Sequence, residues 1–152
     1  MSSQERLSGT CLIQKVLVAV DGSENSERAL DFAMVFAEKY CTTLTVLNVT
    51  ELPAAMYPGN ELMVVAKDLR KLHNAILHRA VERIKATNPA MIVQAVLREG
   101  EPATEIVAVS KDGEFDVVVL GHLGVGKVKG LLMGSISEKV VRLVPCTVIV
   151  VK

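Results

Sequence analysis

The chain has 152 residues, of which 50% are hydrophobic and none is tryptophan, so it can form one domain around an aliphatic core. Its 17 Lys and Arg residues balance 17 Asp and Glu residues, and this zero net charge argues against a nucleic-acid-binding protein. Because no segment approaches the ~20 consecutive apolar residues that cross a bilayer, we expect no membrane partner either.

The N-terminal residues 1–12 are polar and lack the apolar segment of a secretory signal. We therefore expect a flexible leader there, followed by a single cytoplasmic domain over 13–152. Cys11, Cys41 and Cys146 form an odd set whose spacing matches neither a zinc site nor a redox motif. They are predicted to be free thiols in a reducing cytosol.

The first half of the chain predicts two strands and two helices. Val16–Val20 and Leu44–Val49 are short aliphatic runs, typical of strands that are covered on both faces. Ser23 is suited to cap a helix that continues, with apolar residues at helical spacing, as far as Tyr40. A second apolar stripe at helical spacing predicts a longer helix over about 61–86.

The next part of the chain shows the same alternation. Met91–Leu97 and Val117–Leu120 predict a third and a fourth strand. Between them, Pro102 suits the first turn of a helix and Gly113 suits its C-terminal end.

The last helix and strand complete the pattern. Ser135-x-x-Glu138 fits a capping box for a fourth helix, and Thr147–Val151 predicts a fifth strand. Strands that alternate with helices in this way predict an α/β fold. Its sheet is expected to be open and parallel, with right-handed crossovers and helices on both faces.

The segment GHLGVGKVKGLLMGSISEK, residues 121–139, holds five glycines within its first fourteen residues. Ordering glycine is entropically costly, so this backbone is expected to approach something too closely for side chains. The segment lies between the fourth strand and the fourth helix, where open α/β sheets bind ligands and a helix N-terminus attracts anions. Gly134 directly before Ser135, with Lys127 and Lys129 nearby, indicates phosphate binding.

Phosphate contacts alone are not expected to give useful affinity. The helix dipole contributes about 0.3–1 kcal/mol, and each charge-assisted hydrogen bond roughly 1.5–3 kcal/mol. Micromolar binding needs about 8 kcal/mol after the cost of association has been met. A second anchor, such as a buried flat base, is therefore expected.

Two familiar phosphate-binding patterns do not fit this loop. Gly121-x4-Gly126-Lys127 matches the start of a Walker A loop, but Val128 stands where the magnesium-binding Ser or Thr is required. The glycine spacing also departs by one residue from the dinucleotide-binding pattern.

The pattern that does fit is Gly121-x2-Gly124-x9-Gly134-Ser135. In it the sequence resembles the ATP-binding branch of the universal stress protein family, whose nucleotide motif has this spacing. The resemblance covers roughly residues 14–152. It includes KVLVAVDGSENSERAL near the start, REGEPATEIVAVS in the middle and VVRLVPCTVIVVK at the end.

The resemblance implies a Rossmann-like sheet, similar to that of adenine nucleotide alpha hydrolases, with the strand order 3-2-1-4-5. The first and fourth strands are then neighbours, and Asp21 faces the glycine loop where the direction of winding changes. The family also implies ATP, ADP or AMP as the ligand, with magnesium held indirectly by Asp21 through the phosphates.

By the same resemblance, Asp21 contacts ribose or a magnesium-bound phosphate, Val49 binds adenine through its backbone, and Ser135 binds phosphate. The full set of expected nucleotide-binding residues is Ala19, Val20, Asp21, Val49, Gly121, His122, Gly124, Lys127, Gly134, Ser135 and Ile136. No catalytic residue is identified among them.

Several histidine, aspartate and serine positions have a purely structural alternative. Asp21 can form only a turn ahead of the first helix, and Ser135 can serve only as a helix cap. Lys127 and Lys129 can be simply solvated, and His122 is expected at the rim of the pocket. His73 and His78 lie on the long second helix and are expected to face solvent.

The fifth strand would lie at the edge of such a sheet, and a flat aliphatic edge invites pairing with another chain. The family resemblance likewise implies a homodimer through Thr147–Val151. Three functions stay open: a nucleotide-dependent regulatory module in stress response, a slow ATPase or phosphotransferase, and a structural dimer without nucleotide. The complete glycine motif favours the first, while the protein partner of such a module stays unknown.

Overall fold

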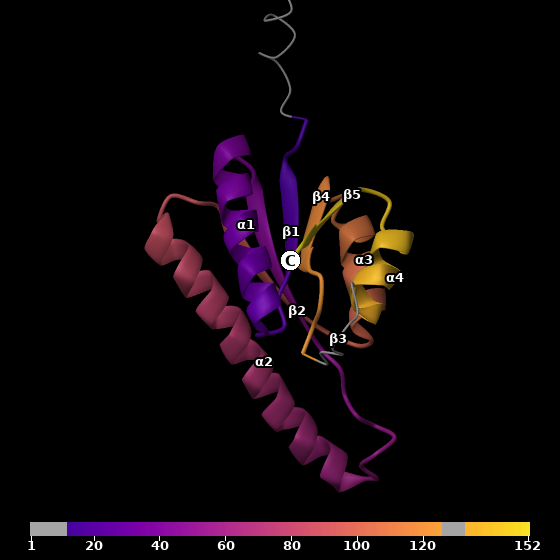
Figure 1. The fold of residues 1–152 in the computed structure, drawn as a ribbon. Coiled ribbons are helices and arrows are strands. Elements are labelled where there is room, and N and C mark those ends of the chain that lie inside the picture. Colours follow the sequence, from indigo (N-terminus) through magenta and orange to yellow (C-terminus); the bar gives the residue numbers. More distant parts are fainter. Residues whose placement is uncertain (1–11, 126–132) are drawn as a thin grey trace, which may run out of the picture.

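A computed structural model describes residues 12–125 and 133–152. Lys127, Lys129 and all of the expected leader except Leu12 lie outside the described residues. Within them, strands and helices alternate as the sequence predicts (Figure 1). The elements are β1 (Lys15–Ala19), α1 (Glu24–Tyr40), β2 (Thr43–Thr50), α2 (Asn60–Thr87), β3 (Val93–Glu99), α3 (Pro102–Asp112), β4 (Val117–Gly121), α4 (Ser135–Leu143) and β5 (Thr147–Val151).

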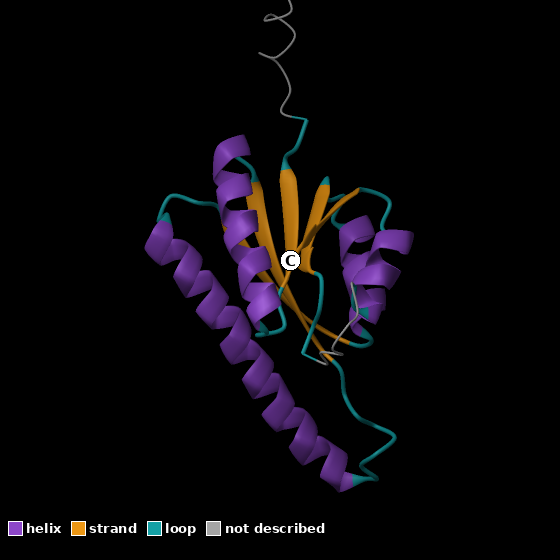
Figure 2. Cartoon of the chain, viewed as in Figure 1, coloured by secondary structure: helices purple, strands orange, loops and turns teal. Residues whose placement is uncertain are grey.

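The strands form one parallel sheet in the order β3-β2-β1-β4-β5, which confirms the predicted topology. Figure 2 shows the sheet between two helical layers, with α1 and α2 on one face and α3 and α4 on the other. The chain winds from β1 toward β3 and then restarts at β4 on the other side of β1. The switch point between β1 and β4 is where open sheets of this kind bind ligands.

The core lies on both faces of the sheet, which explains why the strands are unbroken apolar runs. In β1, Val16 and Val18 belong to the cluster beneath α1 and α2, whereas Leu17 belongs to the cluster beneath α3 and α4. All three side chains are fully buried. Ile84 of α2 and Val140 of α4 are equally buried and close the two clusters from the helical side.

Two of the predicted helix boundaries are confirmed. The Ser23 hydroxyl caps α1 by accepting a hydrogen bond from the backbone N–H of Ser26 at 3.2 Å. Pro102 is the first residue of α3, and Gly113 follows its last residue.

The predicted capping box at the start of α4 is wrong. Gly134 is the N-cap, in an extended conformation with φ −75° and ψ 158°, and Ser135 is already the first helical residue. The Glu138 carboxylate accepts instead from Arg142, at 2.8 Å. Serine is the commoner cap, so the pattern points one residue too far along, whereas the backbone bends at the glycine.

The described helices and cysteines bear on two of the expectations from the sequence. No helix in the ranges 12–125 and 133–152 is both long and apolar enough to span a membrane. Cys41 and Cys146 are free thiols, whereas Cys11 lies outside the described residues. Burial raises the pKa of the Cys146 thiol, which keeps this group protonated at neutral pH.

Glu101 caps α3 and connects it to α4. Its carboxylate accepts from the backbone N–H groups of Ala103 at 3.1 Å and Thr104 at 2.9 Å. It also accepts from Lys139 Nζ of α4 at 2.7 Å. The hydrogen bond from Lys139, helped by that from the Thr104 hydroxyl, lowers the pKa of Glu101 to about 2. This carboxylate therefore fixes the start of α3 next to the middle of α4.

A Glu101→Ala variant is expected to lose about 1 kcal/mol of the free energy of unfolding at pH 7, because an N-cap is lost. The half-exposed ion pair with Lys139 adds little to this value. The stabilisation should be complete above the ordinary carboxyl pKa of 4.5 and should disappear as the pH falls toward 2. Urea unfolding of both proteins across this pH range measures the difference.

Glu105→Ala is the matched control for this measurement. Glu105 lies in the same first turn of α3, so its removal changes the interaction with the helix dipole but leaves the cap in place. Equal losses in the two variants would show that the Glu101 cap does not stabilise the protein.

Candidate functional site

A cavity of about 690 Å³ lies at the C-terminal edge of the sheet, where β1, β2 and β4 end. Its volume is within the range of about 300–1,000 Å³ that is typical of small-molecule sites. The first turns of α3 and α4 and the middle of α2 complete its walls. Of the residues that the sequence predicts for the site, those lining the cavity are Ala19, Val20, Asp21, Val49, Gly121, Gly124, Gly134, Ser135 and Ile136.

Asp21 joins the end of β1 to the glycine loop after β4. Its Oδ1 accepts from the backbone N–H of Ser23 at 2.9 Å, and its Oδ2 accepts from the backbone N–H of Val125 at 3.0 Å. The first bond forms the turn ahead of α1, and the second spans 104 positions of sequence. Asp21 thus has the structural role that the sequence left open as an alternative, and it also lines the cavity.

The glycines of the loop lie against other parts of the same chain. A Cβ at Gly121 would lie 2.8 Å from the backbone carbon and oxygen of Asn25, in the first turn of α1. A Cβ at Gly124 would lie 2.9 Å from Asp21 Oδ2, and one at Gly134 would lie 3.3 Å from the His122 carbonyl oxygen. At these positions, the close approach that the glycines indicate is made by the protein itself.

The start of α4 presents polar groups to the cavity. Ser135 is exposed at the first helical position and lines the cavity beside Ile136. The backbone N–H groups of a first helical turn have no acceptor within the helix, and the dipole makes this end positive. Ser137 is held by its hydroxyl, which donates to the Gly121 carbonyl at 2.8 Å and so fixes the helix against β4. The arrangement suits an anionic group.

The opposite part of the cavity wall is apolar. Leu47 and Val49 of β2 line it together with Pro102 and Ile106 of α3. Such a surface excludes water and offers no charge, so it suits a flat, weakly polar ring. The cavity therefore combines an anion-binding end with an apolar end, as a nucleotide requires.

The sequence model of the universal stress protein family matches residues 12–152. The chain belongs to the universal stress protein family. Among curated relatives, universal stress protein YxiE of Bacillus subtilis (strain 168) is 31% identical over 150 residues, which cover 93% of this chain and 100% of that protein.

Solved structures of universal stress proteins share the fold. Universal stress protein UspA from Lactobacillus plantarum superposes with a TM-score of 0.75 at 28% identity, covering 92% of this chain and 98% of that chain. A universal stress protein in complex with cAMP superposes with a TM-score of 0.72 at 26% identity, covering 93% and 98%. The similarity extends over nearly all of each chain, so the whole fold is that of the family.

His73 of this universal stress protein lies elsewhere than the sequence predicts. It is half-buried, lines the cavity, and places Nδ1 2.6 Å from Asn48 Oδ1, so the expectation that it faces solvent is wrong. The signal was present in the sequence: His73 is three residues before buried Ile76 and therefore lies on the apolar stripe of α2. His78 does face solvent, where it pairs with Glu82.

Other cavity-lining residues were not predicted because they come from elements outside the family motif. They are Ser26, Leu47, Glu51, Leu72, His73, Ile76, Pro102, Ile106, Leu120, Leu123, Val125 and Ser137. Most are apolar residues that the sequence assigns to the core in general. Only their position at the C-terminal ends of the strands distinguishes them from the rest of the core.

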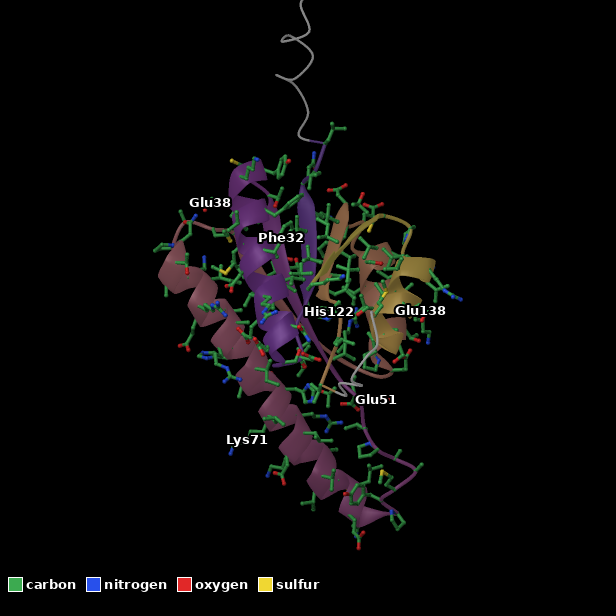
Figure 3. The ribbon with its side chains drawn as sticks, viewed as in Figure 1. Phe32, Glu38, Glu51, Lys71, His122 and Glu138 are labelled. Atoms are coloured by element: carbon green, nitrogen blue, oxygen red, sulfur yellow. The ribbon has the colours of Figure 1, made fainter. Side chains whose placement is uncertain are left out.

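Two of the predicted site residues are not among those that line the cavity. His122 directs its ring toward β5, with Nδ1 3.3 Å from the Val151 carbonyl oxygen, to which its backbone N–H also donates at 2.8 Å. Figure 3 shows His122 beside the sheet and Glu51 where the loop that follows β2 begins. Lys127 lies outside the described residues.

The described residues contain no group of three or more His, Cys, Asp or Glu side chains that could hold a metal ion. Asp21 contacts the glycine loop through Val125, and each of its oxygens already accepts one backbone hydrogen bond. This donor set fits a metal ion that is carried mainly by a ligand's phosphates.

Proposed function

We propose that this universal stress protein binds an adenine nucleotide, with ATP as the expected ligand, and acts as a nucleotide-dependent regulatory module in the stress response of the cytoplasm. One observation carries the proposal. A single cavity is lined by Asp21, by Gly124 and Gly134 of the glycine motif, by the N-terminal end of α4 and by an apolar wall. The similar universal stress protein solved with cAMP supports an adenine nucleotide as the ligand class.

In this proposal each part of the nucleotide has its own part of the cavity. The adenine ring lies against the apolar wall and is bound by the Val49 backbone, and the ribose lies near Asp21, Ala19 and Val20. The phosphates lie at the start of α4, where Gly121, Gly124, Gly134, Ser135 and Ile136 are the expected contacts. Lys127 would add charge from the loop, and magnesium would be held chiefly by the phosphates with Asp21 as an indirect partner.

Titration calorimetry with ATP, ADP and AMP, each with and without magnesium, tests the proposal. Micromolar or tighter binding of at least one of them is expected. Absence of heat with all three, at protein concentrations that would detect millimolar binding, would refute it. Turnover of ATP above roughly 1 s⁻¹ would instead favour the ATPase or phosphotransferase, because that rate is within the range of ordinary enzymes.

We further propose that the protein acts as a homodimer through the β5 edge. β5 pairs with β4 on one side, and its residues Val148 to Val151 are only partly buried. A row of aromatic rings on α1 lies near this edge: Phe32, Phe36 and Tyr40 have successive centroid distances of 6.0 and 4.6 Å. Phe36 packs in the same cluster as Ile149 and Val151, so it connects these aromatic rings to the β5 edge.

Val150→Pro is expected to dissociate the dimer without disturbing the monomer. Thr147 donates its N–H to Asp116, next to β4, and Val151 accepts from His122 on the same side. Because neighbouring residues in a strand point their N–H groups to opposite sides, Val148 and Val150 point away from β4. Proline at Val150 removes an outward donor, and the dimer dissociation constant should rise at least about tenfold.

Analytical ultracentrifugation measures this change, and Ile149→Pro is the contrast. Ile149 points its N–H toward β4, so proline there should destabilise the monomer itself. Two results would refute the proposed interface: a monomeric wild type, or a Val150→Pro variant that dimerises as strongly as the wild type.

A further inference from the structure

A chain of hydrogen bonds leads from the end of β1, through β2, to a side chain of α2 in the cavity. The Asn48 side chain is 1% exposed, and its Nδ2 donates to the Val20 carbonyl oxygen at 2.7 Å. Its Oδ1 lies 2.6 Å from His73 Nδ1. Val20 and His73 both line the cavity, whereas Asn48 lies beneath them.

This chain determines which ring nitrogen of His73 carries the proton. A carbonyl oxygen can only accept, so the Asn48 amide must turn its NH₂ group toward Val20 and its oxygen toward His73. The amide oxygen is also only an acceptor, so His73 must donate from Nδ1. In a neutral imidazole the other nitrogen, Nε2, is then an acceptor with a free lone pair.

The surroundings of His73 keep its ring neutral near pH 7. Burial lowers the pKa of His73, and the charge of Asp21 opposes this effect only in part. Glu51 is the other carboxylate that lines the cavity. With Nδ1 engaged by Asn48, Nε2 is the ring nitrogen left for a ligand in the cavity.

His73 lies on the side of the cavity proposed for the sugar, away from the apolar wall proposed for the base. Residues 48 and 49 are consecutive in β2, so their side chains lie on opposite faces of the sheet. Val49 belongs to the apolar wall beneath α3, whereas Asn48 supports His73 on the α2 side, within electrostatic reach of Asp21. A ribose in the cavity has two neighbouring hydroxyl donors, and Asp21 and His73 Nε2 are two acceptors.

Building on the proposed nucleotide site, we propose that His73 Nε2 accepts a hydrogen bond from a ribose hydroxyl and makes His73 a specificity-determining residue. It would favour ribonucleotides over the deoxynucleotide that lacks the contacted hydroxyl. Ile76, which is 8% exposed and lines the cavity beside it, shields this contact from water and so strengthens it.

The first test compares ligands that differ by one donor. Calorimetry at pH 7.5 is performed with ATP, 2′-deoxy-ATP and 3′-deoxy-ATP. The wild type should bind one of the deoxynucleotides about five- to tenfold more weakly than ATP. His73→Phe keeps a planar ring without an acceptor, and in this variant the ratio should fall to about one. His73→Gln, whose amide can donate to Asn48 and accept from the ribose, should restore part of the ratio.

Leu72→Ala is the control, because it alters the same part of the cavity wall without removing a hydrogen-bonding group. It should weaken ATP and both deoxynucleotides by the same factor. An unchanged ratio in His73→Phe would overturn the proposal. Purine riboside triphosphate, which lacks the 6-amino group of ATP, is measured as a further ligand. The proposal would also be overturned if the wild type bound only this ligand more weakly than ATP and His73→Phe abolished that difference, because His73 would then bind the base.

A second test does not depend on nucleotide binding. Nitrogen-15 chemical shifts of the His73 imidazole at pH 7.5 report which ring nitrogen is protonated, and we expect a protonated Nδ1 and an unprotonated Nε2. The opposite tautomer would overturn the inference even if ATP binds. The expected tautomer together with no binding of any nucleotide would instead refute the proposed function while leaving the His73 acceptor established.

Discussion

Gly121→Ala is expected to lower the free energy of unfolding by about 3 kcal/mol or more, the largest stability loss predicted for this protein. The added Cβ would lie 2.8 Å from the backbone carbon and oxygen of Asn25. Both sides of this contact are backbone in regular elements, β4 and the first turn of α1, so neither can move without disturbing the core. Chemical denaturation of the variant and the wild type measures the loss.

Gly124→Ala is the matched comparison for that measurement. There the added Cβ meets Asp21 Oδ2 at 2.9 Å, and a carboxylate can turn away at a cost of about 1 kcal/mol. The hydrogen bond that the Val125 N–H donates to Asp21 would be lost, so the conformation of the loop should change more than the stability of the protein. If Gly121→Ala proved no more destabilising than Gly124→Ala, the packing of β4 against α1 would not be as close as described.

Gly134→Val is expected to weaken nucleotide binding by at least about 100-fold, because branched methyl groups at the N-cap of α4 would occupy the space proposed for phosphate. The fold should survive. A Cβ at this position lies 3.3 Å from the His122 carbonyl oxygen, which needs an adjustment of only a few tenths of an ångström. Calorimetry with ATP measures the affinity, and thermal unfolding measures the stability.

Gly134→Ala provides the intermediate step in this series. It adds the Cβ without the two further methyl groups, so its ATP affinity should lie between those of the wild type and Gly134→Val. Unchanged affinity in the valine variant, with the dimer and the fold intact, would place the nucleotide at another part of the molecule.

Gly121 and Gly134 illustrate that the spacing of glycines in one motif can have different physical causes at different positions. Gly121 is required by the approach of α1, and its replacement is predicted to affect stability. Gly134 begins a helix at the rim of the cavity, and its replacement is predicted to affect the ligand. An amino-acid sequence indicates that a side chain is excluded at both positions, but it does not say by what.

The amino-acid sequence was sufficient to predict the strands and helices and their order along the chain. Each element shows its burial as a local pattern of apolar residues. Val16–Val20 predicts a strand buried on both faces, and the structure has β1 one residue earlier, at Lys15–Ala19, between two helical layers. The Pro102 and Gly113 boundaries of α3 were predicted equally well, since both depend on local backbone chemistry. The strand order needed the resemblance to a family, because local patterns carry no information about which strands are neighbours.

Only the tertiary structure decided which residues share a site. Asp21 and Val125 are joined across 104 positions, and the His73 ring meets Asn48 across 25 positions, because the parallel sheet brings its C-terminal strand ends and α2 together. The periodicity of apolar residues shows that a residue faces the interior. It does not show whether that residue packs in the core or lines a cavity at the edge of the core. His73 was expected from the sequence to face solvent, whereas in the fold it is half-buried, lines the cavity and places Nδ1 2.6 Å from Asn48 Oδ1.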